Sequence, residues 1–458
     1  MKMNKREKII SALMVFFILS PILWVATAKA EGTGGVSYVG MAKYYDNRKC
    51  AVVITNDDFT RNTTQFNAAL GMLTAKQLYH TIGVQTNYSY GQVNWTYLQY
   101  WLDRGYTEAA SHSRLHQPIP YTDYESEING SKMDIITNVT MPAWYSNGER
   151  EYVYAWLEPG GQSDATARQW LGICGYLADR KVALNGMGMA PWDYLNSLYS
   201  RVGYTIEMGT PPWMGASSNV TYLNGLFDAA YSAGGIYSLM THPAWVNWSS
   251  GSYADQHLSY IANRSDVWYV PFGLSYVYEL AKARVSVTQN AGSEYFTMSI
   301  SAQDHADYGF AYPATYIFTV PSNWTSAAVQ YRHTSSEAWA DLPMKTWGDH
   351  CNGINAARFD VDHGRVYVSV GFSSVSNEIQ VRISGPAPQP APVPAPMPDP
   401  QPTPLPEADG DTCPRCSHTQ FAVDFLSTSA VSLTCLHCGS EYLVTWHKGS
   451  GWSWKEVM

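Results

Sequence analysis

Charge is scarce in this sequence. Charged residues make up 15% of the 458 residues, and the formal net charge is −9 at pH 7. A net negative chain repels polyanions, which argues against nucleic acid as a partner. Hydrophobic residues still account for 45% of the chain, so the low charge does not indicate disorder. The composition and length are typical of a globular chain with two to three domains.

Long hydrophobic runs are absent after residue 30. The one run apolar enough to cross a membrane is 9–26, which follows Lys2, Lys5, Arg6 and Lys8 and precedes the small residues Ala28 and Ala30. Residues 1–30 are therefore predicted to be a secretory signal, with an uncleaved anchor as the alternative. Nine Asn-x-Ser/Thr sequons lie before residue 385. Together these features predict a secreted or cell-surface protein that is N-glycosylated.

Cysteine is also sparse, and most of it lies in one short segment. Of seven cysteines, four fall in residues 413–458 as two C-x2-C pairs: Cys413, Cys416, Cys435 and Cys438. This spacing predicts a zinc-ribbon-like domain that holds one structural Zn²⁺. The domain would dock on an unknown partner. Two disulfides are the open alternative, because the chain is expected to be exported. Prolines recur through 385–412, which predicts an extended linker before this tail.

Residues 31–282 alternate short apolar strands with helical stretches. Strands are expected at 51–55, 107–111 and 236–241, and helices at 97–104, at 223–232 and from a cap at Asp164 to Asp179. This repetition predicts a parallel α/β layout, most simply a distorted (β/α) barrel. In such barrels the chemistry gathers at the carboxyl ends of the strands.

Residues 283–384 change to a β pattern. Alternating or β-branched runs occur at 295–300, 314–320, 327–331, 365–372 and 378–383, with turn residues between them. They predict an antiparallel β-sandwich. Carbohydrate binding and a purely structural role are both open for this domain.

Candidate site residues follow the expected barrel strands. Asp57 and Asp58 follow the first, His112 and His116 the second, and His242 the third. Two histidines four apart, on one face if the segment is helical, can bind a metal together with one carboxylate. The second carboxylate can then take a proton from water, which predicts a mononuclear metal hydrolase.

Three of these fragments resemble the motifs of a known family. Val53–Asp58, Ala110–His116 and Leu239–His242 look like the first, second and fifth motifs of the polysaccharide deacetylases, carbohydrate esterase family 4 (NodB-like). The resemblance covers roughly residues 45–275. It implies a distorted (β/α) barrel that removes acetyl groups from N-acetylglucosamine polymers or related sugars.

The resemblance also implies a role for each residue. Asp58, His112 and His116 would bind a divalent metal, usually zinc. Asp57 would be the general base, and His242 the general acid that protonates the departing amine. General acid–base chemistry suits a carboxylate beside a cation and an imidazole that titrates near neutrality.

The sequence departs from the family pattern in several places. Phe59 replaces a glycine, and the stretch 157–161 lacks the arginine that normally orients the base, for which Arg114 is a candidate substitute. The fourth motif is not evident, and Trp213 is only a candidate wall of the site. The leading hypothesis is an exported deacetylase acting on an acetylated glycan. The alternative is a catalytically altered glycan-binding or surface-structural protein on the same scaffold.

Overall fold

The computed structural model describes residues 35–61, 63–87, 92–148, 150–182, 202–209, 218–289, 294–346 and 353–386, with the backbone of four strands between 421 and 457. The chain divides into two compact units, Met1–Pro386 and Ala387–Met458. The predicted signal at 1–30, Trp213 and most of the predicted linker lie outside the described residues.

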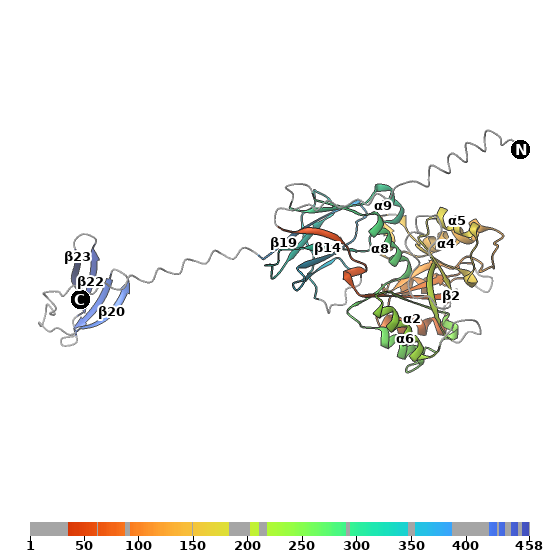
Figure 1. The fold of residues 1–458 in the computed structure, drawn as a ribbon, viewed down its shortest axis with the longest axis horizontal. Helices are drawn as coiled ribbons and strands as arrows, with labels where there is room; N and C mark the ends of the chain where they lie inside the picture. Colours follow the sequence, from red (N-terminus) through yellow and green to blue (C-terminus); the bar gives the residue numbers. More distant parts are fainter. Residues whose placement is uncertain are drawn as a thin grey trace, which may run out of the picture. The chain divides into compact units, whose positions relative to one another are not determined.

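A curled parallel sheet forms the part of the first unit that carries the candidate site (Figure 1). Its strand order is β10-β9-β8-β7-β4-β3-β2-β11, and β10 also pairs with β2 from Ala51 to Asn56. The predicted parallel α/β sheet is confirmed, and its strands curl until β10 meets β2. The strands are β2 (Cys50–Phe59), β3 (His80–Val84), β4 (Thr107–Ser111), β7 (Ala155–Leu157), β8 (Ala178–Val182), β9 (Val202–Met208), β10 (Ile236–Thr241) and β11 (Val267–Tyr269).

Helices follow the strands, and polar side chains cap several of them. Asn94 and Asn219, two of the sequon asparagines, accept hydrogen bonds from the first turns of α3 and α6. The helices are α2 (Thr64–Ala75), α3 (Trp95–Leu102), α4 (Ser131–Asn138), α5 (Ala165–Ile173), α6 (Val220–Ser232), α7 (Tyr253–Ile261), α8 (Phe272–Arg284) and α9 (Ala302–Tyr308). Short elements are η1 (Tyr45–Asn47), the π-helical turn η2 (Ser126–Gly130), η3 (Ala143–Tyr145), η4 (Pro159–Gly161), η6 (Pro243–Trp245), β5 (Ser146–Asn147) and β6 (Arg150–Glu151).

The helix predicted from Asp164 to Asp179 is wrong at its C-terminal end. Asp164 caps α5 as expected, but the helix ends at Ile173 and does not reach Asp179. Gly175 then adopts a φ of +71°, which favours glycine and ends the helix. Residues 178–182 form β8, a central strand between β7 and β9. This strand carries an arginine that becomes important at the site.

Two antiparallel sheets occupy the region that follows the barrel. Phe296 of one sheet and Phe318 of the other lie 4.8 Å apart between ring centroids, and both belong to the same hydrophobic core as much of the barrel. The strand β1 (Ser37–Met41) precedes the barrel in sequence but pairs with β14. One sheet is β1, β14 (Ala314–Thr319), β18 (Arg365–Val370) and β17 (Ala356–Asp360); the other is β12 (Ser286–Thr288), β13 (Phe296–Ser299), β19 (Glu378–Ser384), β15 (Ala328–Arg332) and β16 (Ala340–Asp341).

The second unit contains a four-stranded antiparallel sheet in the order β20-β21-β22-β23. Its strands are β20 (Phe421–Ser427), β21 (Ala430–Cys435), β22 (Glu441–His447) and β23 (Gly451–Val457). Cys413, Cys416 and Cys438 lie outside the described residues, as does the side chain of Cys435. The zinc-ribbon assignment therefore stays a prediction. In the first unit, Cys50 and Cys174 are free thiols.

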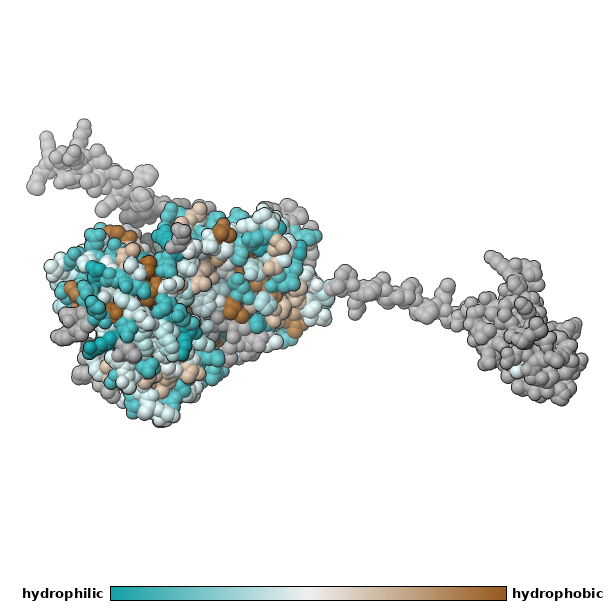
Figure 2. Space-filling model, turned by 180° about the vertical axis from the view of Figure 1, so that it is seen from behind, coloured by the Kyte–Doolittle hydropathy of each residue, from teal (hydrophilic) through white to brown (hydrophobic). Residues whose placement is uncertain are grey.

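The surface is mostly hydrophilic on the face shown in Figure 2, where hydrophobic side chains are scattered among polar ones. Exposed apolar residues such as Val361 and Val375 are normal on soluble proteins when they stand singly. Within the described residues, no helix combines the length and apolar character that crossing a bilayer would require.

Glu108 is a fully buried carboxylate at the amino-terminal end of the barrel. Its Oε2 accepts hydrogen bonds from Thr81 Oγ1 (2.6 Å) and from the backbone N–H of Gly273 (2.8 Å), in the first turn of α8. A helix N-terminus favours a negative charge. Burial is the larger effect, however, and raises the pKa of Glu108 to about 7. Helix α8 therefore begins against the end of the barrel opposite to the carboxyl ends of its strands.

Replacing Glu108 with glutamine should flatten the pH dependence of stability. Because the folded-state pKa lies above the unfolded one, the native protein gains stability from the bound proton below about pH 4.5 and loses it as pH rises to about 7. The loss is on the order of 3 kcal/mol at ~1.4 kcal/mol per pKa unit. Glu108→Gln stays neutral, so its free energy of unfolding should rise relative to wild type between pH 5 and pH 8.

Urea titrations at pH 5 and at pH 8 measure this difference in the free energy of unfolding. The exposed Glu378→Gln is the control, and equal pH slopes for Glu108→Gln and wild type would contradict the prediction.

Candidate metal centre

A β-bulge in β2 brings two adjacent carboxylates to one site. Neighbouring strand residues normally point to opposite faces, so Asp57 and Asp58 would be expected to diverge. The pairing between β2 and β3 shifts register between Asn56 and Phe59, and Asp58 adopts a φ of +68°. A bulge of this kind re-aims side chains at a barrel rim. As a result, the charges of both aspartates act on His242.

The segment that carries His112 and His116 is a loop, so the helical geometry considered for the two histidines does not occur. It follows β4 directly, and Ser113 and His116 have φ values of +64° and +53°. Left-handed residues are incompatible with a continuing right-handed helix. The loop nevertheless brings the two imidazoles together, with ring centroids 4.8 Å apart. The Ser113 hydroxyl supports this shape by accepting a hydrogen bond from the backbone N–H of His116.

Asp58, His112 and His116 form a potential metal-binding cluster. One ligand atom from each residue lies within 4.8 Å of the other two. Asp58 Oδ1 lies 3.3 Å from Nε2 of His112 and 3.5 Å from Nε2 of His116. Two imidazole nitrogens and one carboxylate oxygen are a typical donor set of a three-ligand catalytic zinc site. The structure therefore brings together the three predicted ligands.

His112 is already oriented as a ligand. Its Nδ1 donates a hydrogen bond to the backbone carbonyl of Leu157 (2.7 Å). Because a carbonyl only accepts, Nδ1 carries a proton, so in the neutral imidazole it is Nε2 that has the lone pair for a cation. This Nε2 is buried and makes no hydrogen bond within the described residues. A buried nitrogen of this kind, facing a carboxylate and a second imidazole, fits a bound metal ion.

The electrostatics keep Asp58 ionised. Burial alone would raise the pKa of Asp58, but the imidazoles of His112, His242 and His116 together hold it far below its ordinary value. The amide of Gln85, which follows β3, donates a hydrogen bond to Asp58 Oδ1. Burial, together with the neighbouring His112, lowers the pKa of His116, which favours the neutral imidazole that can bind a metal ion.

Asp57 lies beside this cluster and is held by an arginine that sequence analysis missed. Arg180 Nη2, from β8, donates to Asp57 Oδ2 at 2.5 Å, and both residues are almost fully buried. The other oxygen, Oδ1, is buried and makes no hydrogen bond in the described part of the chain. Arg114, the substitute suggested by the sequence, binds Asp134 instead. Asp57 is therefore fixed through one oxygen while the other can accept a proton.

His242 is paired with a second missed residue, Glu207 of β9. His242 Nδ1 lies 2.7 Å from Glu207 Oε1, and His242 Nε2 lies 3.7 Å from Asp58 Oδ2. Burial would lower the pKa of His242, but the hydrogen bond to Glu207 and the charges of Asp57 and Asp58 outweigh it and raise the pKa. The ring of Trp245 lies 4.4 Å from that of His242. His242 is thus well suited to carry a proton near neutral pH.

The two missed residues gave different signals in the sequence. Glu207 interrupts an apolar run just before Gly209, as a functional residue at a strand end often does. Arg180 stands between Asp179 and Lys181, and three consecutive charges hide a buried strand completely. Only the tertiary structure could identify it.

Comparisons with known proteins do not identify the chain by sequence. No family model matches, and no curated protein matches. Among solved structures, the chain is similar to a polysaccharide deacetylase from Bacillus cereus, with 19% identity and a TM-score of 0.26 over 32% of this chain and 44% of that one. It is also similar to a family 4 acetyl xylan esterase from Clostridium thermocellum, solved with a cobalt ion, with 14% identity and a TM-score of 0.30 over 50% and 91% of the two chains.

A peptidoglycan N-acetylglucosamine deacetylase from Eubacterium rectale gives 12% identity and a TM-score of 0.27 over 48% and 86% of the two chains. The match spans less than half of the Bacillus cereus protein. Likenesses this weak establish neither the activity nor the substrate of this chain, which must be argued from its own residues.

Proposed function

We propose that this chain is an exported, metal-dependent deacetylase that hydrolyses acetyl groups, N-acetyl in the first place, on a polysaccharide or cell-surface glycan. The observation that carries this proposal is the asymmetric setting of Asp57. Arg180 holds one of its oxygens, and the other is free beside Asp58, His112 and His116. His242, which forms an ion pair with Glu207, lies beside Asp58 of the same cluster. The residues proposed as base, acid and metal ligands therefore lie at one site.

The motif resemblance in the sequence supports the same class, the polysaccharide deacetylases. The strongest departure from that pattern was the missing arginine near Glu158. Arg180 lies on β8, which pairs with β7, the strand that ends at Leu157. From there its buried guanidinium donates a hydrogen bond to Asp57. With Arg180 in contact with Asp57, the absence of an arginine from residues 157–161 no longer indicates a catalytically altered protein.

Asp58, His112 and His116 would hold the divalent ion, for which zinc is proposed. When bound, the ion would supply Lewis-acid polarisation of the acetyl carbonyl. Asp57 Oδ1 then takes a proton from the attacking water, while Arg180 keeps the carboxylate oriented. His242 gives a proton to the departing amine as the C–N bond breaks. Acetate and a free amino sugar are the products.

Metal removal tests this function directly. We expect that the purified chain releases acetate from acetylated chitooligosaccharides, that a chelator abolishes the release, and that stoichiometric Zn²⁺ restores it. Metal analysis of the same samples reports occupancy. A protein that binds metal and sugar but releases no acetate from a broad panel of N- and O-acetylated glycans would instead be the non-catalytic glycan-binding protein.

Glu207→Gln should shift the pH profile of the reaction. The hydrogen bond and charge of Glu207 raise the pKa of His242, and a general acid must be protonated to act. Without the charge, His242 loses its proton at lower pH. We expect the alkaline limb of kcat/KM to move to lower pH than in wild type, with both proteins metal-loaded. Glu378→Gln serves as the control, and an unmoved limb in Glu207→Gln would show that Glu207 does not tune the acid.

A further inference from the structure

The loop between the two histidine ligands has a backbone that needs support. Ser113 and His116 both lie in the left-handed region, at φ +64° and +53°. Such residues are strained and persist only where the surroundings hold them. Since His112 and His116 must converge on one ion, the groups that hold Ser113–Leu115 also set the geometry of the ligands.

A buried glutamate binds the loop backbone from one side. Glu127 Oε2 accepts hydrogen bonds from the backbone N–H groups of both Arg114 and Leu115, each at 3.0 Å. Glu127 is 3% exposed and lies in the π-helical turn η2. Single π-helical turns are rare and are frequent at functional sites. One carboxylate oxygen thus fixes two consecutive peptide groups between the ligands.

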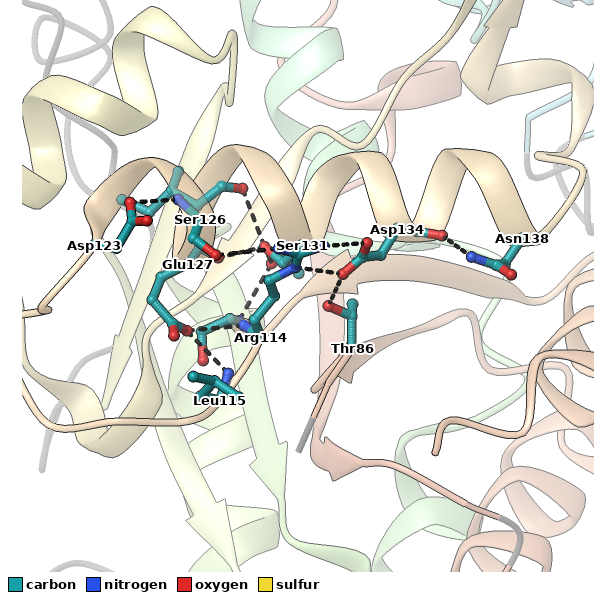
Figure 3. A network of polar contacts seen from close by, with 12 residues as sticks. Thr86, Arg114, Leu115, Asp123, Ser126, Glu127, Ser131, Asp134 and Asn138 are labelled. Carbon is teal, nitrogen blue, oxygen red and sulfur yellow. Dashed lines mark hydrogen bonds and ion pairs between the residues drawn. The ribbon is translucent and has the colours of Figure 1, made fainter. Parts of the chain in front are cut away.

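The Arg114 side chain connects the same loop to α4. Its Nε and Nη2 donate to Asp134, each at 2.7 Å, and its Nη1 donates to Ser126 Oγ at 3.1 Å (Figure 3). The guanidinium lies against Gly130, where a Cβ atom would come within 2.9 Å of Arg114 Cζ. A bidentate arginine–carboxylate pair adds geometric precision as well as energy.

A third set of hydrogen bonds that hold this loop comes from the segment after β3. The hydroxyl of Thr86 donates to Asp134 Oδ2 at 2.6 Å (Figure 3). The backbone N–H groups of Thr86 and Asn87 donate to the carbonyls of Ser113 and Arg114. Every peptide group from Ser113 to Leu115 therefore has a hydrogen bond to a neighbouring element.

We propose that Glu127, Arg114 and Asp134 are positioning residues that hold the His112–His116 loop in its metal-binding shape before the ion arrives. They act through the loop backbone and not on the ion. A preformed pair of ligands binds more tightly because the ordering of the loop is completed during folding. The inference rests on the proposed function only in requiring a divalent ion at Asp58, His112 and His116.

Zinc affinity measured without any substrate tests the inference. The dissociation constant comes from competition with a chromophoric chelator, and the Co²⁺-substituted protein gives an absorption spectrum that reports ligand geometry. Glu127→Ala and Arg114→Met should raise the dissociation constant about 10- to 100-fold, as loss of outer support typically does, and alter the Co²⁺ spectrum. Glu127→Gln keeps an acceptor oxygen and should recover most of the affinity.

Arg150→Met is the matched control, because Arg150 forms an exposed ion pair with Asp307. Its affinity should equal that of wild type. Arg114 is 32% exposed at its side chain, so Arg114→Met opens no buried cavity and decides the question if Glu127→Ala does not fold. Wild-type affinity and an unchanged Co²⁺ spectrum in folded Arg114→Met would overturn the proposal.

The outcomes separate this inference from the proposed function. If the wild-type chain binds zinc and the variants lose affinity, the inference holds even where no acetate is released, and only the deacetylase function fails. If the wild-type chain binds no divalent metal, both fail together.

Discussion

Asp57→Asn is expected to lower the rate of acetate release about 10²- to 10⁴-fold, the usual contribution of a general base, while the chain still binds zinc. Asp57 Oδ1 is the one carboxylate oxygen of the pair that is buried without a hydrogen bond in the described residues. An asparagine can keep the hydrogen bond from Arg180 but cannot accept a proton from water. The change therefore removes the chemistry and leaves the ligand set intact.

The adjacent aspartate provides the matched control. Asp58→Asn removes the carboxylate that faces His112 and His116, so metal content should fall together with the rate. Single-turnover acetate release and zinc analysis of the two variants separate the roles. Asp57→Asn with nearly wild-type kcat, or with zinc lost as in Asp58→Asn, would exclude Asp57 as the base.

Arg180→Met is expected to lower the free energy of unfolding by about 3–5 kcal/mol, because removing one partner of a buried ion pair leaves an uncompensated charge. Arg180 is fully buried and donates to Asp57 at 2.5 Å. Methionine fills much of the same space without a donor. Acetate release should fall as well, since Asp57 loses the group that orients it.

Urea titration measures this loss, and the exposed Arg150→Met should change stability by no more than about 0.5 kcal/mol. The double variant Asp57→Asn/Arg180→Met tests the cause. Because it removes the unpaired charge, it should recover part of the stability lost in Arg180→Met, a coupling that independent sites do not show. Strict additivity of the two single changes would indicate that Arg180 stabilises the protein by packing alone.

Three strands of the barrel could be predicted from sequence because they are buried on both faces. Parallel strands covered by helices read as apolar runs, as 236–241 does where β10 lies. The expected 107–111 coincides with β4, although Glu108 interrupts its small and apolar residues. Polar residues placed directly after such runs then marked His112 and His242 as candidates. Asp57 and Asp58 were found the same way, although they lie inside β2 and not behind it.

Strand β8 could not be predicted in this way. Its central residues are Asp179, Arg180 and Lys181, and charge in place of an apolar run made the segment look like the end of a helix. Its strand character comes from pairing with β7 and β9, and the buried charge of Arg180 is tolerated because Asp57 lies opposite. These are long-range facts that no local pattern contains.

The sequence by itself determined the residue types of the site and their order along the chain: the aspartate pair, the two histidines four apart, and the later histidine. It could do so because each follows or ends a strand whose burial is visible in its composition. The tertiary structure decided what each residue can do. Only the bulge at Asp58 turns both carboxylates to one site. The closing of the sheet brings Arg180 of β8 to Asp57 of β2, and the pairing of β9 with β10 places Glu207 beside His242. Those partners come from other strands, so their roles depend on three-dimensional contact and not on spacing.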